Sequence, residues 1–271
     1  MARQQAGRPK RLDYATVIGL PAGLALVLLC QWLEGGSPRT ILQLTAAVIV
    51  CGGTIAAVAV SFTPDELTSA ARALRSVFDA SVEPPQTTID LVIHWAGRAR
   101  KLGFVSLENE LPHVSDPFLS KGLGLVVDGV SAAMVRDILE LENANREEED
   151  EGPARVYEAA AGYAPTLGIL GAVLGLIQVM QHLSDPSRLG AGIAVAFVAT
   201  VYGVGLANLV LFPVATKLRA KAHAEARRRQ LLLEGIVGIT EGLNPRTLRE
   251  RLVSCSGRPE LDAIQRHGRV A

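Results

Sequence analysis

The apolar residues of the chain are gathered into four long runs, separated by polar segments. Residues 16–33, 40–61, 159–180 and 189–214 contain no Asp, Glu, Lys, Arg or His. Each run has the roughly 17–25 residues that a helix needs to cross the hydrocarbon core of a bilayer. The pattern therefore predicts an all-α integral membrane protein with four transmembrane helices and a lipid bilayer as its surroundings. It excludes a wholly water-soluble protein.

The first run has a second interpretation, because basic residues before an apolar stretch are also the layout of a cleaved secretory signal. The run lacks a small-x-small cleavage pattern, and Leu28 and Leu29 are too bulky for a lipoprotein-type site before Cys30. Tyr14 and Trp32 bracket the run. At 1.5 Å per residue they are about 27 Å apart, which suits aromatic anchoring at both membrane interfaces. We interpret the run as a transmembrane helix.

Charge adds an orientation to this picture. The chain has 27 Lys and Arg and 27 Asp and Glu, so its net charge is zero and a nucleic-acid partner is not expected. The segments 1–15, 62–158 and 215–271 carry 25 of the 27 basic residues. Because cytoplasmic segments of membrane proteins are enriched in Lys and Arg, both termini are predicted to be cytoplasmic.

Four parts follow from this arrangement. Residues 1–61 form an N-terminal cytoplasmic segment and a first membrane hairpin, and residues 159–214 form a second hairpin. Between them, residues 62–158 are predicted to be a cytoplasmic helical domain, inserted between spans 2 and 3. Residues 215–271 are predicted to be a cytoplasmic helical tail.

Within the insert, Thr63 is followed by a Pro and two acidic residues, and this pattern predicts the start of a helix. Apolar residues at helical spacing predict further helices from Thr88 to Lys101 and from Pro117 to Asn145. The acidic run 147–151 is interpreted as a solvated connector. In the tail, glycines are expected to loosen the helical pattern before a short helix begins at Asn244-Pro245.

Spans 3 and 4 differ from the first hairpin in being rich in small residues at four-residue spacing. Lines of this kind let helix backbones approach closely. Either they pack the two spans of one hairpin, or they also contact further helices. Two other features stand out: Pro165, which frees a backbone carbonyl in span 3, and Thr200, near the middle of span 4.

The chain offers little catalytic or metal-binding chemistry. It has no phosphate-binding loop, His-Glu-x-x-His pair, nucleophile elbow or dinucleotide fingerprint. Its three cysteines do not form an even, closely spaced framework. We expect no enzymatic activity, no cofactor and no metal site. Because no span carries Asp, Glu, Lys, Arg or His, the chain alone is not expected to carry protons across a membrane.

Four stretches of the sequence resemble the A subunit of the bacterial flagellar stator, the MotA/PomA family. They are residues 100–108 (RKLGFVSLE), 164–175 (APTLGILGAVLG), 196–203 (AFVATVYG) and 242–250 (GLNPRTLRE). The related TolQ/ExbB energisers share the last hairpin but have a single span before their main cytoplasmic region. A membrane scaffold or transporter without a motor role is the alternative from another class.

The resemblance implies a multi-pass protein of the bacterial inner membrane that converts ion flux into torque. It implies a pentamer of A subunits around two MotB-type B subunits, which supply the ion-binding Asp. The ion pathway is expected beside Pro165, Ala172 and Thr200. Sodium-using relatives tend to carry a hydroxyl where this sequence has Ala172, so the transported ion is expected to be H⁺, with Na⁺ as the alternative.

The resemblance also implies a surface for the rotor switch protein FliG. The corresponding residues in this sequence are Arg100, Lys101, Glu108 and Glu110, while Asn109 departs from relatives that have a further acid there. Charged side chains of this kind are by default a solvated surface, and an exposed ion pair contributes only about 0–1 kcal/mol. Contacts that form and break repeatedly are expected to be weak individually and sensitive to salt.

Overall fold

The computed structural model of the protein describes residues 12–36, 41–79, 83–184 and 186–257. The chain divides into two compact units, each made of two segments. Unit 1 comprises residues 1–81 and 150–220, and unit 2 comprises residues 82–149 and 221–271. The described residues are helical, with an isolated bridge between Leu12 and Asp79 as their only β-type pairing. The all-α prediction is therefore confirmed.

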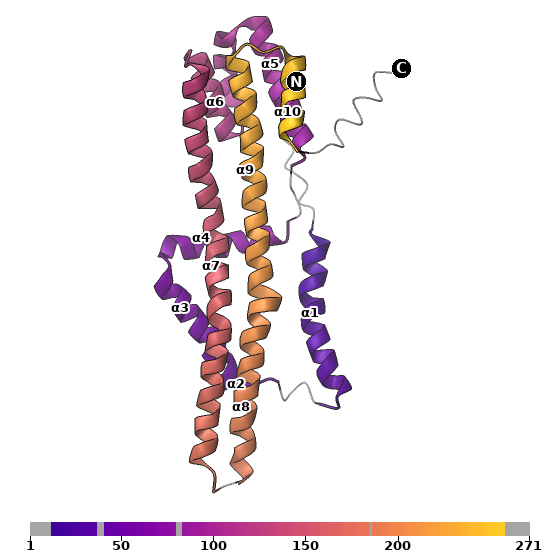
Figure 1. Cartoon of the computed structure of the whole chain (residues 1–271), viewed down its shortest axis with the longest axis vertical. Helices are drawn as coiled ribbons and strands as arrows, with labels where there is room; N and C mark the ends of the chain where they lie inside the picture. The colour runs from indigo at the N-terminus through magenta and orange to yellow at the C-terminus, as the bar shows by residue number, and fades with distance from the viewer. Residues whose placement is uncertain (1–11, 37–40, 80–82, 185, 258–271) are drawn as a thin grey trace. The chain divides into compact units, whose positions relative to one another are not determined.

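Four helical stretches are long and apolar enough to cross a membrane, as the hydrophobic pattern predicted. The first is α1 (Tyr14–Leu33). The second consists of α2 (Leu44–Ala47), a π-helical turn η2 (Val48–Gly52) and α3 (Gly53–Ser61). The third is part of α7 (Ala132–Gln181), and the fourth runs through α8 (Pro186–Gly205), the π-helical turn η4 (Leu206–Leu211) and α9 (Phe212–Thr240) (Figure 1).

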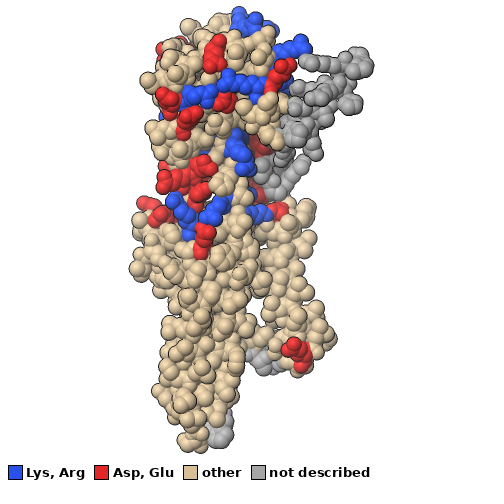
Figure 2. Space-filling view, viewed as in Figure 1, with Lys and Arg blue, Asp and Glu red and all other residues tan. Residues whose placement is uncertain are grey.

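The membrane-spanning segments present an apolar surface to their surroundings. Helix α1 has no buried residue, and side chains such as Leu26 and Ile18 are mostly exposed. In Figure 2 these segments are almost without Lys, Arg, Asp or Glu, which gather instead over the helices outside the apolar stretches. An exposed face of this composition is stable only against lipid or other apolar helices.

Helix α4 (Pro64–Val77) belongs to unit 1 and begins as the sequence predicted. Thr63 and Glu66 form a reciprocal capping box: the Thr63 backbone N–H donates to Glu66 Oε2 at 2.8 Å, and the Glu66 N–H donates to Thr63 Oγ1 at 3.4 Å. The buried side of α4 packs on α7, where the Tyr157 hydroxyl donates to the Ala70 carbonyl at 3.1 Å.

Unit 2 is built around one apolar core. Its helices are α5 (Pro85–Leu102), the 3₁₀ segment η3 (Phe104–His113), α6 (Pro117–Val127), the unit's portions of α7 and α9, and α10 (Pro245–Cys255). The largest side chains of this core are fully buried, among them Ile89, Phe118, Leu139, Leu232 and Leu248. The helix predicted at Asn244-Pro245 is confirmed as α10, whose cap is the Asn244 side chain.

Three details differ from the sequence expectations. The stripe predicted over 117–145 is divided into α6 and the start of α7 by a turn at Gly129, which has φ +72°. The acidic run 147–151 does not interrupt the chain as a separate connector, because α7 continues through it and through Pro153. Its residues are mainly good helix formers, and Ala154 beyond them is fully buried, so both propensity and packing favour continuation.

The third difference concerns the glycines of the tail. Helix α9 continues through Gly235 and Gly238, where a loosened pattern was expected. A Cβ at Gly235 would lie 2.3 Å from Val92 Cγ1, and a Cβ at Gly238 would lie 2.4 Å from Leu248 Cδ1. These glycines allow α5 and α10 to pack closely on α9. The helix ends before Gly242, whose φ of +68° favours glycine.

Candidate functional site

The residues predicted to line an ion pathway lie in unit 1, at a close contact between α7 and α8. The centre of the contact is a pair of glycines, Gly168 of α7 and Gly203 of α8. A Cβ at Gly168 would lie 2.8 Å from the Ala199 carbonyl oxygen and 3.4 Å from Thr200 Cα. A Cβ at Gly203 would lie 3.1 Å from Pro165 Cα. Pro165 and Thr200 therefore flank the same backbone contact.

The contact continues along the two helices with further small residues. A Cβ at Gly175 would lie 2.8 Å from both the Gly192 carbonyl oxygen and the Ala196 nitrogen. Gly171 faces Ala199 in the same way and also approaches Ile49 of η2, which belongs to the second span. Packing within the hairpin thus uses much of the small-residue pattern. The line of small residues that contains Gly171 also contacts the second span of the same chain.

The polar atoms at this contact are few. The Thr200 hydroxyl donates to the Ala196 carbonyl of its own helix at 3.3 Å, which is the common arrangement for a Thr in a membrane helix. Ala172, one turn beyond Gly168, is half-buried and brings no oxygen ligand beyond its backbone. Pro165 is half-buried and removes one backbone donor from α7.

Tyr202 ties the second hairpin to the first, a role that the sequence analysis missed. Its hydroxyl donates to the Ile41 carbonyl at 2.6 Å and accepts from the Gln43 N–H at 3.4 Å. The hydroxyl of a Tyr within an apolar span needs a hydrogen-bond partner, and this requirement was the only indication of the contact in the sequence. The partner itself lies about 160 residues away and has no local signature.

Two charged side chains of unit 1 meet at the start of the first span. Asp13 caps α1 and forms an ion pair with Lys217 of α9, which also bonds to the Thr16 hydroxyl. A cleft of about 390 Å³ lies beside this pair, between α1, α4 and the η4–α9 region. Asn208 lines it, and its side-chain amide donates to the Val204 carbonyl at 2.9 Å.

The four predicted rotor-binding residues lie in unit 2, around the end of α5 and the start of η3. Gly103 ends α5 with φ +81°, so the chain turns sharply between Lys101 and Glu108. Arg100, Lys101 and Glu108 are exposed, and none of the three bonds to a residue that the structure describes.

Glu110 is placed differently from those three residues. It is half-buried and forms an ion pair with Arg98 of α5. The sequence analysis did not foresee this pair, although Arg98 lies only 12 residues earlier. Glu110 therefore holds η3 against α5, which leaves Arg100, Lys101 and Glu108 as the charges available to another protein.

Most other charges of unit 2 are engaged within it. Arg136 of α7 binds Glu234 of α9 through two bonds, of 2.6 and 3.1 Å, and Arg251 of α10 donates to the same carboxylate at 2.7 Å. The hydrogen bonds from Arg136 hold the pKa of Glu234 below its ordinary value, although burial opposes the shift. This triad joins three helices at the edge of the core.

A second pair anchors α6. The Asp116 side chain caps this helix by accepting from the Phe118 and Leu119 N–H groups at 2.9 and 3.0 Å. Arg228 of α9 forms an ion pair with the same carboxylate. Burial raises the pKa of Asp116, but these hydrogen bonds and the guanidinium lower it more, so its net shift is downward.

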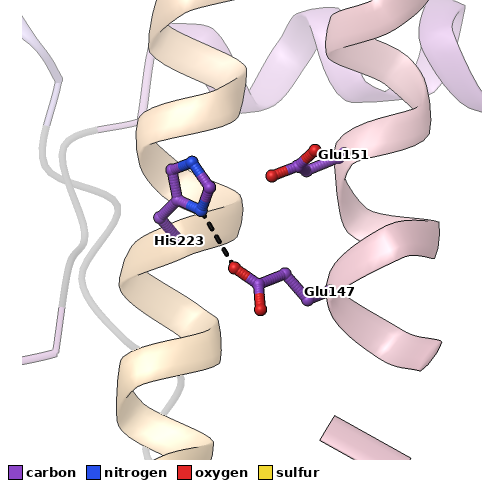
Figure 3. A group of neighbouring side chains, drawn as sticks. All are labelled: Glu147, Glu151 and His223. Atoms are coloured by element: carbon purple, nitrogen blue, oxygen red, sulfur yellow. Dashed lines mark hydrogen bonds and ion pairs between the residues drawn. The ribbon is translucent and has the colours of Figure 1, made fainter. Parts of the chain in front are cut away.

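Glu147, from the acidic run, also has a partner. His223 Nδ1 of α9 lies 3.0 Å from Glu147 Oε1 (Figure 3). Glu151, also labelled in Figure 3, lies one helical turn farther along α7. Glu147 is thus engaged with α9, whereas Glu148, Glu149 and Asp150 are exposed, as expected of a solvated run. The sequence contained the acids but gave no means of placing His223 opposite them.

The sequence of the chain is similar to those of known membrane proteins. The MotA/TolQ/ExbB proton channel family matches residues 110–231. The chain is 37% identical to the uncharacterized protein YtxD of Bacillus subtilis over 93% of both chains. It is 34% identical to motility protein A of Bacillus subtilis, over 89% of this chain and 90% of the relative.

A solved structure extends the similarity to the fold. The structure of the flagellar MotAB stator complex from Bacillus subtilis matches with a TM-score of 0.84 and 32% identity. The match covers 93% of this chain and 99% of the other. Both hairpins, the insert between them and the tail are therefore included in the similarity.

Proposed function

Because the chain belongs to the MotA/TolQ/ExbB proton channel family and is homologous to motility protein A, we propose that it is a stator A subunit that couples proton flux to torque on the flagellar rotor. The observation that carries this proposal is the match to a MotAB stator structure over nearly the whole of both chains. The match includes two spans before the insert, where a TolQ or ExbB protein would have one.

The ion-binding group is proposed to come from a MotB-type partner. None of the four apolar runs contains Asp, Glu, Lys, Arg or His, so a proton crossing the bilayer here is proposed to need a carboxylate from another chain. The contact of Gly168 with Gly203 is filled by the packing of α7 on α8, so a partner helix is proposed to pack beside it, where Pro165 and Thr200 remain half-buried. An A-subunit pentamer around two B subunits is the assembly that we propose.

Proton flux into vesicles tests this division of roles. Vesicles with the A subunit alone should show no flux above that of empty vesicles, and vesicles with both subunits should conduct. A B subunit whose membrane Asp is replaced by Asn serves as the matched control, because it should assemble but not conduct. Flux through the A subunit alone would refute the proposal that the partner supplies the ion-binding group.

The proposed transported ion is H⁺. Ala172 offers no side-chain oxygen, so Thr200 is the only hydroxyl among the three proposed pathway residues that could serve as a hard oxygen ligand for Na⁺. Cells that rely on this stator should swim equally fast with and without sodium at constant proton-motive force. Swimming that stops when sodium is withdrawn would overturn the assignment.

The rotor-facing surface is proposed to be the exposed charges at the end of α5 and the start of η3. Both termini and this surface are then cytoplasmic, in agreement with the distribution of Lys and Arg. Arg100→Glu should impair motility without affecting membrane insertion or co-purification with the B subunit. A compensating charge reversal on FliG should restore motility in part. Normal torque in an Arg100→Glu, Glu108→Lys double variant would favour the solvated-surface interpretation.

A further inference from the structure

We propose that Leu102 and Val105 form the apolar centre of the contact with the rotor, and that Arg100, Lys101 and Glu108 form its charged rim. We call these five residues the α5–η3 surface. The proposal rests on the rotor-binding role proposed above and extends it, because that role was assigned to charged residues alone.

The exposure of the two apolar side chains is the first observation. Leu102, the last residue of α5, is 62% exposed, and Val105, the second residue of η3, is 71% exposed. The same short stretch is firmly anchored, because Ala99 before it and Leu107 after it are buried in the core of unit 2. The fold thus buries Ala99 and Leu107, leaves Phe104 37% exposed, and exposes Leu102 and Val105 considerably more.

The charges around this apolar pair indicate the kind of partner. Two basic residues precede Leu102 directly, and Glu108 follows Val105 by three residues. None of the three is bonded to a residue that the structure describes, whereas nearby Arg98 and Glu110 neutralise each other. An anionic lipid surface would attract the two bases but repel Glu108. A protein surface with an apolar patch between acidic and basic side chains is complementary to all five residues.

The apolar pair and the charged rim are expected to contribute to binding in different ways. Exposed ion pairs each contribute little free energy, so three charges alone make a weak contact that salt disrupts. Apolar side chains that become buried on binding lose their contact with water, which contributes more free energy than an exposed ion pair does. Charges at a rim act mainly on the association rate, while central apolar groups act mainly on the dissociation rate.

Binding kinetics separate these contributions. The A–B stator complex, purified whole and placed in nanodiscs, is immobilised, and FliG is passed over it at low and high salt. Leu102→Ser and Val105→Ser should each raise the dissociation rate about tenfold, by nearly the same factor at both salt concentrations. Arg100→Glu should instead lower the association rate, and its effect should shrink at high salt.

Matched variants control for the loss of an exposed apolar side chain. Leu141 of α7 is 65% exposed, so Leu141→Ser removes a similar side chain from another helix of the same unit and should leave both rates unchanged. Leu102→Met keeps the apolar volume and should retain wild-type dissociation. Unchanged melting temperatures of all variants are expected, because the altered side chains make few contacts within the fold.

The outcomes distinguish this inference from the function on which it rests. If wild-type stator does not bind FliG, the rotor-binding role itself is wrong. If wild type binds and Arg100→Glu weakens binding, but the Leu102 and Val105 variants dissociate as slowly as wild type, only the apolar centre is refuted. Variants that alter binding to vesicles containing phosphatidylglycerol, or self-association of the stator, with FliG kinetics unchanged, would also overturn it.

Discussion

Replacing Gly203 by Ala tests the backbone contact on which the second hairpin depends. The added methyl group would lie 2.6 Å from the Ala164 carbonyl oxygen, 3.0 Å from Gly168 Cα and 3.1 Å from Pro165 Cα. All three are backbone atoms of α7, so no flexible side chain can move aside. Ordinary contact begins at 3.4 Å. The two helices must therefore separate by several tenths of an ångström or bend.

The size of the effect follows from the packing that is lost. Forcing one extra methyl group into a well-packed interface typically costs about 1–3 kcal/mol. For a chain of this length, a loss of about 2 kcal/mol corresponds to a melting temperature lower by roughly 4–8 °C. Because Pro165 and Thr200 flank the contact, Gly203→Ala should also reduce motility by altering their separation.

Thermal unfolding of the detergent-solubilised protein, followed by helical circular dichroism, measures this effect. Gly205→Ala is the matched control, since it lies two residues away in the same helix and a Cβ there would meet no atom within 4 Å. Gly162→Ala, also without a neighbour within 4 Å, gives the same control on α7. Both controls should leave the melting temperature unchanged or raise it slightly, because Ala favours helix over Gly.

A Gly203→Ala protein that melts at the temperature of the Gly205→Ala control would refute the reasoning. It would mean that α7 and α8 accommodate the methyl group without cost, so their close approach is not a stability requirement. A lower melting temperature with normal swimming would separate the two claims: the contact would stabilise the hairpin without controlling function.

Three further predictions concern unit 2. Glu234→Gln leaves Arg136 facing a neutral amide in the triad and should destabilise the protein by about 2 kcal/mol, measured by thermal unfolding. Asp116→Ala removes a helix cap and an ion pair and should lower the free energy of unfolding by about 2 kcal/mol. Asp128→Ala is the control, because the Asp128 carboxylate is exposed and has no bond to a described residue. It should change the free energy of unfolding by less than about 0.5 kcal/mol. Because the pKa of Asp116 lies below its ordinary 3.8, its charged form stabilises the fold fully above that pH, and this stability is lost as pH falls through the lower folded value. An Asp116→Asn variant should therefore show a flatter decline in melting temperature below about pH 4 than wild type; parallel declines would contradict the pKa assignment.

The parts of the fold that the sequence predicted are those governed by local rules. An apolar run of some 20 residues has few structures open to it in a bilayer, so the four spans followed from composition alone. Capping likewise depends on a few neighbouring residues, and the starts of α4 and α10 were predicted from Thr63 and Asn244.

The sequence could not supply the pairings between distant segments. The bond from Tyr202 to the Ile41 carbonyl and the pair of Glu147 with His223 join residues far apart in the chain. Gly235 was predicted to loosen a helix, since a glycine in a helical pattern has that effect when nothing packs against it. Its actual neighbour is Val92, and only the three-dimensional contact distinguishes the two roles.

The polar groups of the two units find their partners in different ways. The groups that each unit lacks or leaves exposed agree with the proposed function. In unit 1 the spans carry no Asp, Glu, Lys, Arg or His, and the Thr200 hydroxyl bonds to the backbone of its own helix, so the proposed proton transfer would take a group from another protein. In unit 2 most charged side chains are engaged in pairs such as Arg136 with Glu234. Exposed charges of both signs lie in the stretch from Arg100 to Glu108, together with the exposed apolar side chains of Leu102, Phe104 and Val105. A stator must hold one partner in the membrane and touch another only transiently. Spans without a carboxylate of their own suit the first task, and a mixed, salt-sensitive surface suits the second.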